Sequence, residues 1–314
     1  MTSLPHSPQN WLELMDTLGD EASCEQWLAE VRWPNGFVCP SCGSQNACRL
    51  SSRPVWQCRD CRRQTSVTAG TAMHRSKVPL RIWVYALWLM SVRKVTISAL
   101  QFQRETGIGS YKTCWNLLHK VRATLDESVD DKLHQGTVEL DESQLGGRRG
   151  RKGRRLGEGG RWLVIAVERI VVQKKGKVYT CSGSARAEVS TNCNAETLLG
   201  FAEKSIAEGA VVQTDGWASY ARLKDRGWQH WPVPVHGDKV VLDRVFPKVH
   251  LFASNFKALI IGTFHGVSGK YLHRYLAAFT YRFNRRAKKQ DLFAFLARRI
   301  CRVPHQSEQK LVAC

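Results

Sequence analysis

Two aspartates stand at positions where a sheet could bring them together. In the run 137–142 (TVELDE) apolar and acidic residues alternate, so Glu139 and Asp141 are expected on one face of a strand. Asp215 ends a second apolar run, 210–215, directly before a glycine, and open α/β sheets carry their chemistry at strand ends of this kind. A pair of carboxylates there could hold one or two Mg²⁺ ions for phosphodiester chemistry. The competing interpretation of a single aspartate at a strand end is a turn or a helix cap.

Four cysteines have the spacing of a metal site. Cys39 and Cys42 form one C-x-x-C turn, and after fifteen residues Cys58 and Cys61 form a second. Each turn can place two thiolates about 2.3 Å from one zinc ion, and the two turns complete a tetrahedron. Because no ligand position stays open, the predicted zinc is structural and not catalytic. Arginines surround these turns and are candidates for phosphate contact: Arg49, Arg53, Arg59, Arg62 and Arg63.

Basic residues greatly outnumber acidic residues in this chain. There are 47 Lys and Arg against 27 Asp and Glu, a formal net charge of +20 over 314 residues. A basic field of this size attracts polyanions, so we expect a nucleic acid partner. The alternatives are anionic lipid, or a surface charge that only keeps the protein soluble. The sequence lacks an 18-residue apolar run and a basic-then-apolar leader, which favours a cytoplasmic, nucleoid-associated protein without a membrane partner.

Five segments of different composition follow one another and must position these groups. Residues 1–33 have helical periodicity, and residues 34–70 are rich in Cys, Gly, Arg and Ser, as small metal-stapled modules are. Residues 79–127 are again helical. Residues 136–290 mix strand-like and helical runs, and residues 291–314 form a C-terminal helix and tail.

The 136–290 segment is predicted to be an α/β domain. Three strands in sequence, a helix, a fourth strand and further helices are typical of that class. The strands are expected at 137–143, 161–172, 176–184 and 210–215, and the helices near 194–207, 217–226, 249–261, 268–285 and 290–301. A glycine-containing basic loop lies between the first two strands, and its cations are phosphate-binding candidates: Arg148, Arg149, Arg151, Lys152, Arg154 and Arg155.

The 79–127 segment contains a predicted helix-turn-helix. Thr96 could cap one helix, and residues 107–110 (GIGS) make a turn whose Ser110 caps the next. This last helix would present polar and basic side chains, including Lys112 and His119, to DNA. An ordinary helical hairpin is the alternative, because many such hairpins have the same pattern.

Longer motifs accompany the aspartates and the cysteines. They are 214–217 (TDGW), 262–268 (GTFHGVS) and 279–286 (FTYRFNRR), together with Gly146-Gly147 behind the Asp141 strand. With the predicted zinc ribbon, they make the run from about 36 to 290 resemble the ISXO2-like (IS1595-family) transposases. The resemblance implies a retroviral-integrase-type, RNase-H-like core that cuts and joins DNA 3′ ends with Mg²⁺ or Mn²⁺. It also implies the terminal inverted repeats of an insertion sequence as substrate, and a homodimer or higher oligomer on DNA.

The resemblance carries three metal ligands onto this sequence. The first two fall on Asp141 and Asp215, but the third departs from the usual pattern, because no Asp or Glu lies between 244 and 290. Relatives place a Glu on a helix seven residues before a Lys, and counting back from the GTFHGVS motif gives Lys257 and His250. Imidazole can coordinate a divalent ion and favours Mn²⁺ and softer metals. Asn255 is the competing third ligand, although on a helix it points away from the face shared by positions 250 and 257.

The remaining basic residues and the alternative functions complete the expectations. Lys257 would contact a phosphate near the cleavage site, or else be part of a solvated helix face. Arg282, Arg285 and Arg286 would follow the backbone of bound DNA, or simply keep the last helices soluble. The missing third carboxylate leaves open a catalytically degenerate DNA-binding regulator. A nuclease acting on RNA–DNA hybrids would share the core but would not need the zinc ribbon.

Overall fold

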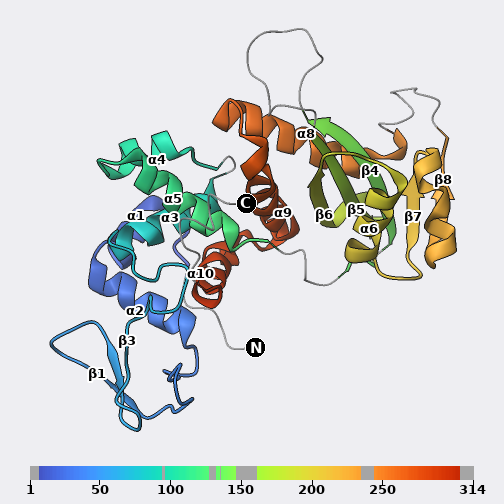
Figure 1. The fold of residues 1–314 in the computed structure, drawn as a ribbon. Helices are drawn as coiled ribbons and strands as arrows, with labels where there is room; N and C mark the ends of the chain where they lie inside the picture. Colours follow the sequence, from blue (N-terminus) through green and yellow to red (C-terminus); the bar gives the residue numbers. More distant parts are fainter. Residues whose placement is uncertain are drawn as a thin grey trace. The chain divides into compact units, whose positions relative to one another are not determined.

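The chain folds into two compact units. The computed structural model describes residues 7–93, 96–126, 132–134, 136–145, 161–234 and 244–304. The first unit is Met1–Leu125 with Arg285–Cys314, and the second is Asp126–Asn284 (Figure 1). The basic loop proposed to bind phosphate, which holds Arg148, Arg149, Arg151, Lys152, Arg154 and Arg155, lies outside the described residues.

The first unit is a set of helices followed along the chain by a small sheet and further helices. Its helices are α1 (Trp11–Leu18), α2 (Glu21–Arg32), α3 (Leu80–Val92), α4 (Ala99–Thr106), α5 (Tyr111–Ala123), the 3₁₀ turn Arg286–Asp291 and α10 (Leu292–Arg302). Its antiparallel sheet is β1 (Ala47–Arg49), β2 (Trp56–Cys58) and β3 (Gln64–Thr65). α10 packs against α2 and α3, where Phe293 stacks on Trp27 with ring centroids 4.5 Å apart. This contact buries the apolar face of the C-terminal helix.

The two helices predicted around the turn at residues 107–110 are present as α4 and α5, with two corrections. Ser110 caps α5 as expected, and Gly107 closes α4 with a φ of 68° that suits glycine. The cap of α4 is Ser98 and not Thr96, because the helix begins two residues later than its apolar pattern suggested. His119 does not belong to an exposed face; it is fully buried and stacks on Trp115.

A five-stranded mixed sheet forms the second unit, which confirms the α/β class. The strands are β4 (Thr137–Leu145), β5 (Arg161–Lys174), β6 (Lys177–Ser190), β7 (Val211–Thr214) and β8 (Gln229–Pro232). They lie in the order β6-β5-β4-β7-β8 (Figure 1). β5 is antiparallel to both of its neighbours, β4 and β6, whereas β7 pairs in parallel with β4 and with β8. β8 was not predicted, since four residues with one proline are a weak strand pattern.

Helices cover both faces of this sheet. On one face α6 (Ala195–Ser205) and the 3₁₀ helix η1 (Ala218–Arg226) pack on a cluster that includes Val138 and Leu140. On the other face the helix α8 (Pro247–Leu259), the π turn Ile260–Phe264, the 3₁₀ turn Gly269–Tyr271 and α9 (Leu272–Asn284) follow one another. The alternation predicted for β4 therefore holds, and its acidic face lies under α8.

Helices within the described ranges are too short or too polar to span a lipid bilayer.

Candidate functional site

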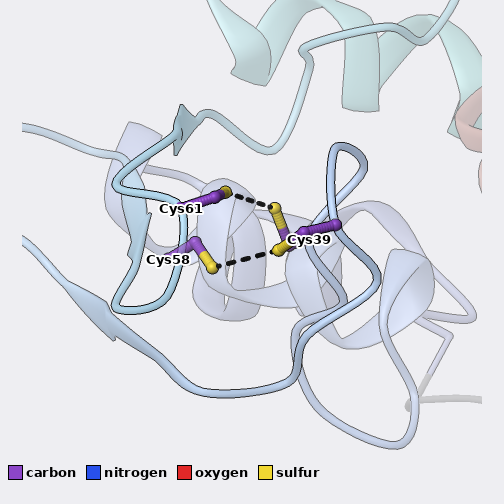
Figure 2. Close-up of side chains that lie close together, drawn as sticks. Cys39, Cys58 and Cys61 are labelled. Carbon is purple, nitrogen blue, oxygen red and sulfur yellow. Dashed lines mark hydrogen bonds between the residues drawn. The ribbon is translucent and has the colours of Figure 1, made fainter.

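The four cysteines converge in the first unit. The Sγ atoms of Cys39 and Cys61 are 3.5 Å apart, and those of Cys42 and Cys58 are 3.6 Å apart (Figure 2). All four sulfur atoms lie within 4.8 Å of one another. A tetrahedral zinc ion with Zn–S bonds of about 2.3 Å spaces its sulfurs about 3.8 Å apart, so the observed cluster has the size that the ion requires.

Backbone amides and aromatic packing prepare this cluster for metal. The N–H of Cys42 lowers the pKa of the Cys39 thiol to about 6, and the N–H of Cys61 lowers the pKa of Cys58. Both effects favour the thiolate form that binds metal. Trp33 packs edge-to-face on Trp56 with centroids 5.0 Å apart, next to the buried Cys58. A core this small needs the metal for stability.

Asp141 lies on β4, and Asp215 is the residue directly after β7, the parallel neighbour of β4. The pairing of β4 with β7 runs Thr137 with Val211 through Glu139 with Gln213. Both aspartates lie two residues beyond that last pair, so continuing the register sets Asp141 opposite Asp215. Burial is the main cause of a raised pKa for Asp215, and the charge of Asp141 raises it further. This mutual repulsion is what a divalent cation would relieve.

His250 lies against the first of these aspartates. It is on α8, and its Nε2 is 3.2 Å from Oδ2 of Asp141. Two helical turns further along α8, Nζ of Lys257 donates a hydrogen bond to Oγ of Ser143 at 2.7 Å. Burial lowers the pKa of Lys257, while Asp141 acts to raise it. Asn255 is exposed on another face of the helix.

Glu142, the residue after Asp141, lies on the opposite face of β4 and is not one of the candidate metal ligands. Tyr220 on η1 is fully buried and donates its hydroxyl to this carboxylate in a short hydrogen bond. Burial raises the pKa of Glu142 to about 7, and the charges of Asp141 and Asp215 add to the effect. Because η1 follows Asp215 directly, this hydrogen bond joins the two segments that carry the aspartates.

Glu139 fixes the beginning of α8. Its side chain is fully buried, and one carboxylate oxygen accepts the backbone N–H groups of Lys248 at 2.8 Å and Val249 at 3.1 Å. These are the second and third residues of a helix that starts with Pro247 and has no capping side chain of its own. A carboxylate there also meets the positive end of the helix dipole. Burial raises the pKa of Glu139. The two hydrogen bonds and the charge of Arg169, whose Nη1 lies 3.6 Å away, act to lower this pKa but do not outweigh burial.

Two family models match the chain. The ISXO2-like transposase domain matches residues 133–284, and the transposase zinc-ribbon domain matches residues 19–64. The chain is a member of the ISXO2-like transposase family. A relative described as an uncharacterized protein in transposable element ISH50 of Halobacterium salinarum is 28% identical over 283 residues, which cover 85% of this chain and 92% of the relative. No solved structure gives a significant match.

In this ISXO2-like transposase the structure separates the candidate residues into distinct groups. The zinc-ribbon match and the cysteine geometry together support a structural zinc ion. Among the described residues, the four cysteines form the group of three or more potential metal ligands whose ligand atoms all lie within 4.8 Å of one another. Asp141 and His250 are in contact, but together with Asp215 they do not form a group within 4.8 Å. Lys112 is exposed on α5 of the first unit, whereas Arg282 is half-buried with a pKa lowered by burial. Arg285 and Arg286 are also half-buried.

The sequence pattern did not reveal three polar residues around the transposase site. The alternation of β4 predicts the face on which Glu139 lies but not its hydrogen-bond partners, and the sequence offers no link between Glu142 and Tyr220. The alternation of β4 was a usable indication that Glu139 is covered by a helix. The Tyr220–Glu142 bond joins positions 78 residues apart, so no local pattern indicates it.

Proposed function

We propose that this ISXO2-like transposase cleaves DNA at the ends of an insertion sequence and joins those ends to target DNA in a metal-dependent reaction. The observation that carries the proposal is the position of Asp215 directly after β7, the parallel neighbour of the strand that carries Asp141, with His250 3.2 Å from Asp141. The strand order, with three antiparallel strands followed by two parallel ones, is compatible with the RNase-H-like core that the family resemblance implies.

The donor set suits a divalent cation. Two neighbouring ligands of an octahedral ion, each about 2.1 Å from it, lie about 3 Å apart, which is close to the separation of His250 and Asp141. Asp141, Asp215 and His250 would therefore hold Mg²⁺ or Mn²⁺. When bound, the metal supplies activation of the attacking oxygen and stabilisation of the leaving oxygen. Asn255, on the exposed face of α8, is the weaker candidate for the third ligand.

The protein groups around the proposed metal ligands would orient the DNA and hold the site in shape. The ammonium of Lys257, half-buried beside Ser143, would hold a phosphate oxygen at the site. Hydrolysis joins a water oxygen to phosphorus and breaks the bond from phosphorus to the 3′ oxygen. The free 3′-hydroxyl would then attack a phosphorus of the target strand, so that a new bond from this oxygen to phosphorus forms, the bond from that phosphorus to the target's own 3′ oxygen breaks, and the released oxygen takes up a proton. Glu139 and Tyr220 would keep α8 and η1 in place through both steps.

DNA binding would be shared among the predicted segments. Exposed arginines of the zinc ribbon, Lys112 on α5 and the net charge of +20 support contacts to phosphates. The proposed segments of the chain are residues 1–33, 34–70, 79–127, 136–290 and 291–314. We also propose assembly as a homodimer or higher oligomer on DNA in the cytoplasm.

A catalytically degenerate, DNA-binding regulator is the second candidate. The absence of Asp and Glu between 244 and 290 favours it, because imidazole replaces the expected third carboxylate. Strand cleavage separates the two candidates. The test incubates purified protein with Mg²⁺ or Mn²⁺ and end-labelled duplexes that carry the inverted repeats flanking its gene.

Asp141→Ala and Asp215→Ala should abolish nicking and joining in that test. Asp225→Ala is the matched control, since this aspartate is exposed on η1. It should leave the reaction unchanged. Binding of the repeats without cleavage under both metals would replace the transposase proposal with the regulator.

A further inference from the structure

The hairpin of β5 and β6 extends past the rest of the sheet. The pairing of β4 with β5 ends at Thr137 and Arg169, whereas β5 and β6 remain paired from Ile170 with Cys181 to Lys174 with Lys177. Residues 170–181 therefore form a two-stranded β arm, and among the residues that the structure describes no further strand pairs with either of its edges. A free two-stranded hairpin is marginally stable in water.

The side chains of this β arm are unusual for a free hairpin. Four of its apolar residues face solvent: Val171 is 65% exposed, Val172 41%, Val178 68% and Tyr179 50%. The arm has no acidic residue, and its turn holds Lys174, Lys175 and Lys177. Exposed apolar side chains next to lysines, with no acidic residue among them, are typical of a surface that binds a polyanion. Such a polyanion would also offer apolar surface to these side chains.

The turn at the tip keeps a lysine where glycine or asparagine is usual. Lys175 has a φ of 51° and Gly176 a φ of 72°, as the tight hairpin turn with two left-handed residues requires. A lysine in that conformation costs roughly 1 kcal/mol relative to glycine. Local folding does not favour it, so the cation at the tip has another use.

The root of the β arm is built to aim it. Between Val167 and Arg169 the register shifts, so that Gly183 and Ser184 of β6 stand opposite Glu168 alone. The buried carboxylate of Glu168 accepts the N–H of Ser184 at 2.8 Å and that of His134 at 3.0 Å. A Cβ at position 183 would come within 2.6 Å of that carboxylate, which explains the glycine. Bulges of this kind bend a hairpin away from its sheet.

The bent arm is also anchored to the helix that carries His250. Nζ of Lys248 donates to the carbonyl oxygen of Thr180 at 2.8 Å. DNA held at Asp141 and His250 would therefore have the root of the arm beside it.

We propose that the β arm, residues 170–181, inserts into the major groove of duplex DNA, with its lysines on phosphates and Val172 and Tyr179 against the groove walls. The major groove admits a two-stranded ribbon of this width. The proposal rests on the proposed function, because it assigns a further DNA-binding surface to the transposase.

The test measures the affinity of the full-length, zinc-loaded protein for a mixed-sequence 30-bp duplex over a series of salt concentrations. The variant replaces Lys174, Lys175 and Lys177 by alanine. The control replaces Lys204, Arg222 and Lys224, exposed cations of the same unit, and so removes the same charge. The arm variant should bind about tenfold more weakly, and the slope of log affinity against log salt should fall by about 2.7, as expected for three lost phosphate contacts. The control variant should change the affinity and the salt slope by only a small fraction of these amounts.

A second variant tests the apolar contact and the competing occupant. Val172 and Tyr179 are paired directly across the two strands of the arm. The double variant Val172→Thr, Tyr179→Thr keeps residues that favour β-strands at both positions and removes their apolar surface. It should weaken DNA binding without changing the salt slope. Unchanged DNA binding with a smaller sedimenting species would show that the arm contacts a second copy of the chain, and would overturn the proposal.

The failures of the two proposals differ. If the lysine variant behaves like the control while the wild type binds DNA, the arm proposal fails alone. If the wild type does not bind DNA at all, the proposed function fails with it.

Discussion

Nε2 of His250 on α8 lies 3.2 Å from Oδ2 of Asp141 on β4. The two residues are 109 positions apart, and the contact exists because α8 crosses the acidic face of β4 in one particular register. Glu139 sets that register by binding the first turn of the helix. The position of the candidate third ligand therefore depends on a residue that has no chemical role of its own.

Replacement of His250 should change the metal preference of the transposase. His250→Ala should reduce strand cleavage by about 100-fold or more, because one of the three proposed ligands to the ion would be lost. His250→Glu should restore activity and shift the preference from Mn²⁺ towards Mg²⁺, since a carboxylate is the harder ligand. Cleavage rates in each metal measure this. Asn255→Ala serves as the control; a loss of activity in that variant larger than in His250→Ala would reverse the assignment.

Removal of Glu139 should destabilise the second unit. Glu139→Ala leaves the N–H groups of Lys248 and Val249 without their acceptor, and removes the carboxylate that pairs with Arg169. We expect a loss of roughly 2–4 kcal/mol in the free energy of unfolding, measured with urea. Glu139→Gln keeps an oxygen for the two N–H groups and should lose less. Glu188→Ala, on an exposed and widely spaced ion pair, should change stability by less than about 0.5 kcal/mol, and an equal loss there would refute the capping role.

Glu142 should make the stability of the zinc-loaded protein depend on pH when no Mg²⁺ or Mn²⁺ is added. Its pKa is raised to about 7 in the folded chain, mainly by burial, so the unfolded chain releases the proton more readily. The fold is then favoured at low pH and loses up to about 3 kcal/mol as the pH rises from about 4.5 through 7. Glu142→Gln stays neutral and should gain stability over the wild type at pH 8 relative to pH 5. Urea unfolding at both values measures this, and a constant difference between the two proteins would contradict it.

Loss of zinc should unfold the zinc ribbon. Cys58 is fully buried among Trp33, Phe37 and Trp56, and its thiolate is one of four that the metal holds. Cys58→Ser should lose the bound zinc and make residues 34–70 sensitive to proteases, because metal binding supplies on the order of 10 kcal/mol of folding free energy in small zinc modules. Cys48→Ser lies outside the cluster and should keep one zinc per chain. Full zinc content in the Cys58 variant would count against the four-cysteine site.

Local patterns were enough where the interacting residues are close in sequence. The cysteine spacing predicted the cluster because each C-x-x-C turn arranges two ligands by itself. The Ser110 cap and the alternation of β4 were also predictable, since hydrogen bonds and strand periodicity act over two to four residues.

The tertiary structure decided everything that joins distant strands and helices. The parallel pairing of β4 with β7 brings Asp141 and Asp215 to the same end of the sheet, although they are 74 residues apart. The hydrogen bond from Tyr220 to Glu142 depends on the packing of the 3₁₀ helix η1, which carries Tyr220, against the sheet. By itself, the sequence determined which residue types are available: four zinc-binding thiols, an excess of positive charge and two aspartates without a third carboxylate. Which of them meet was decided by strand register and helix docking, because burial of the apolar faces selects one arrangement out of many that satisfy the local patterns equally well.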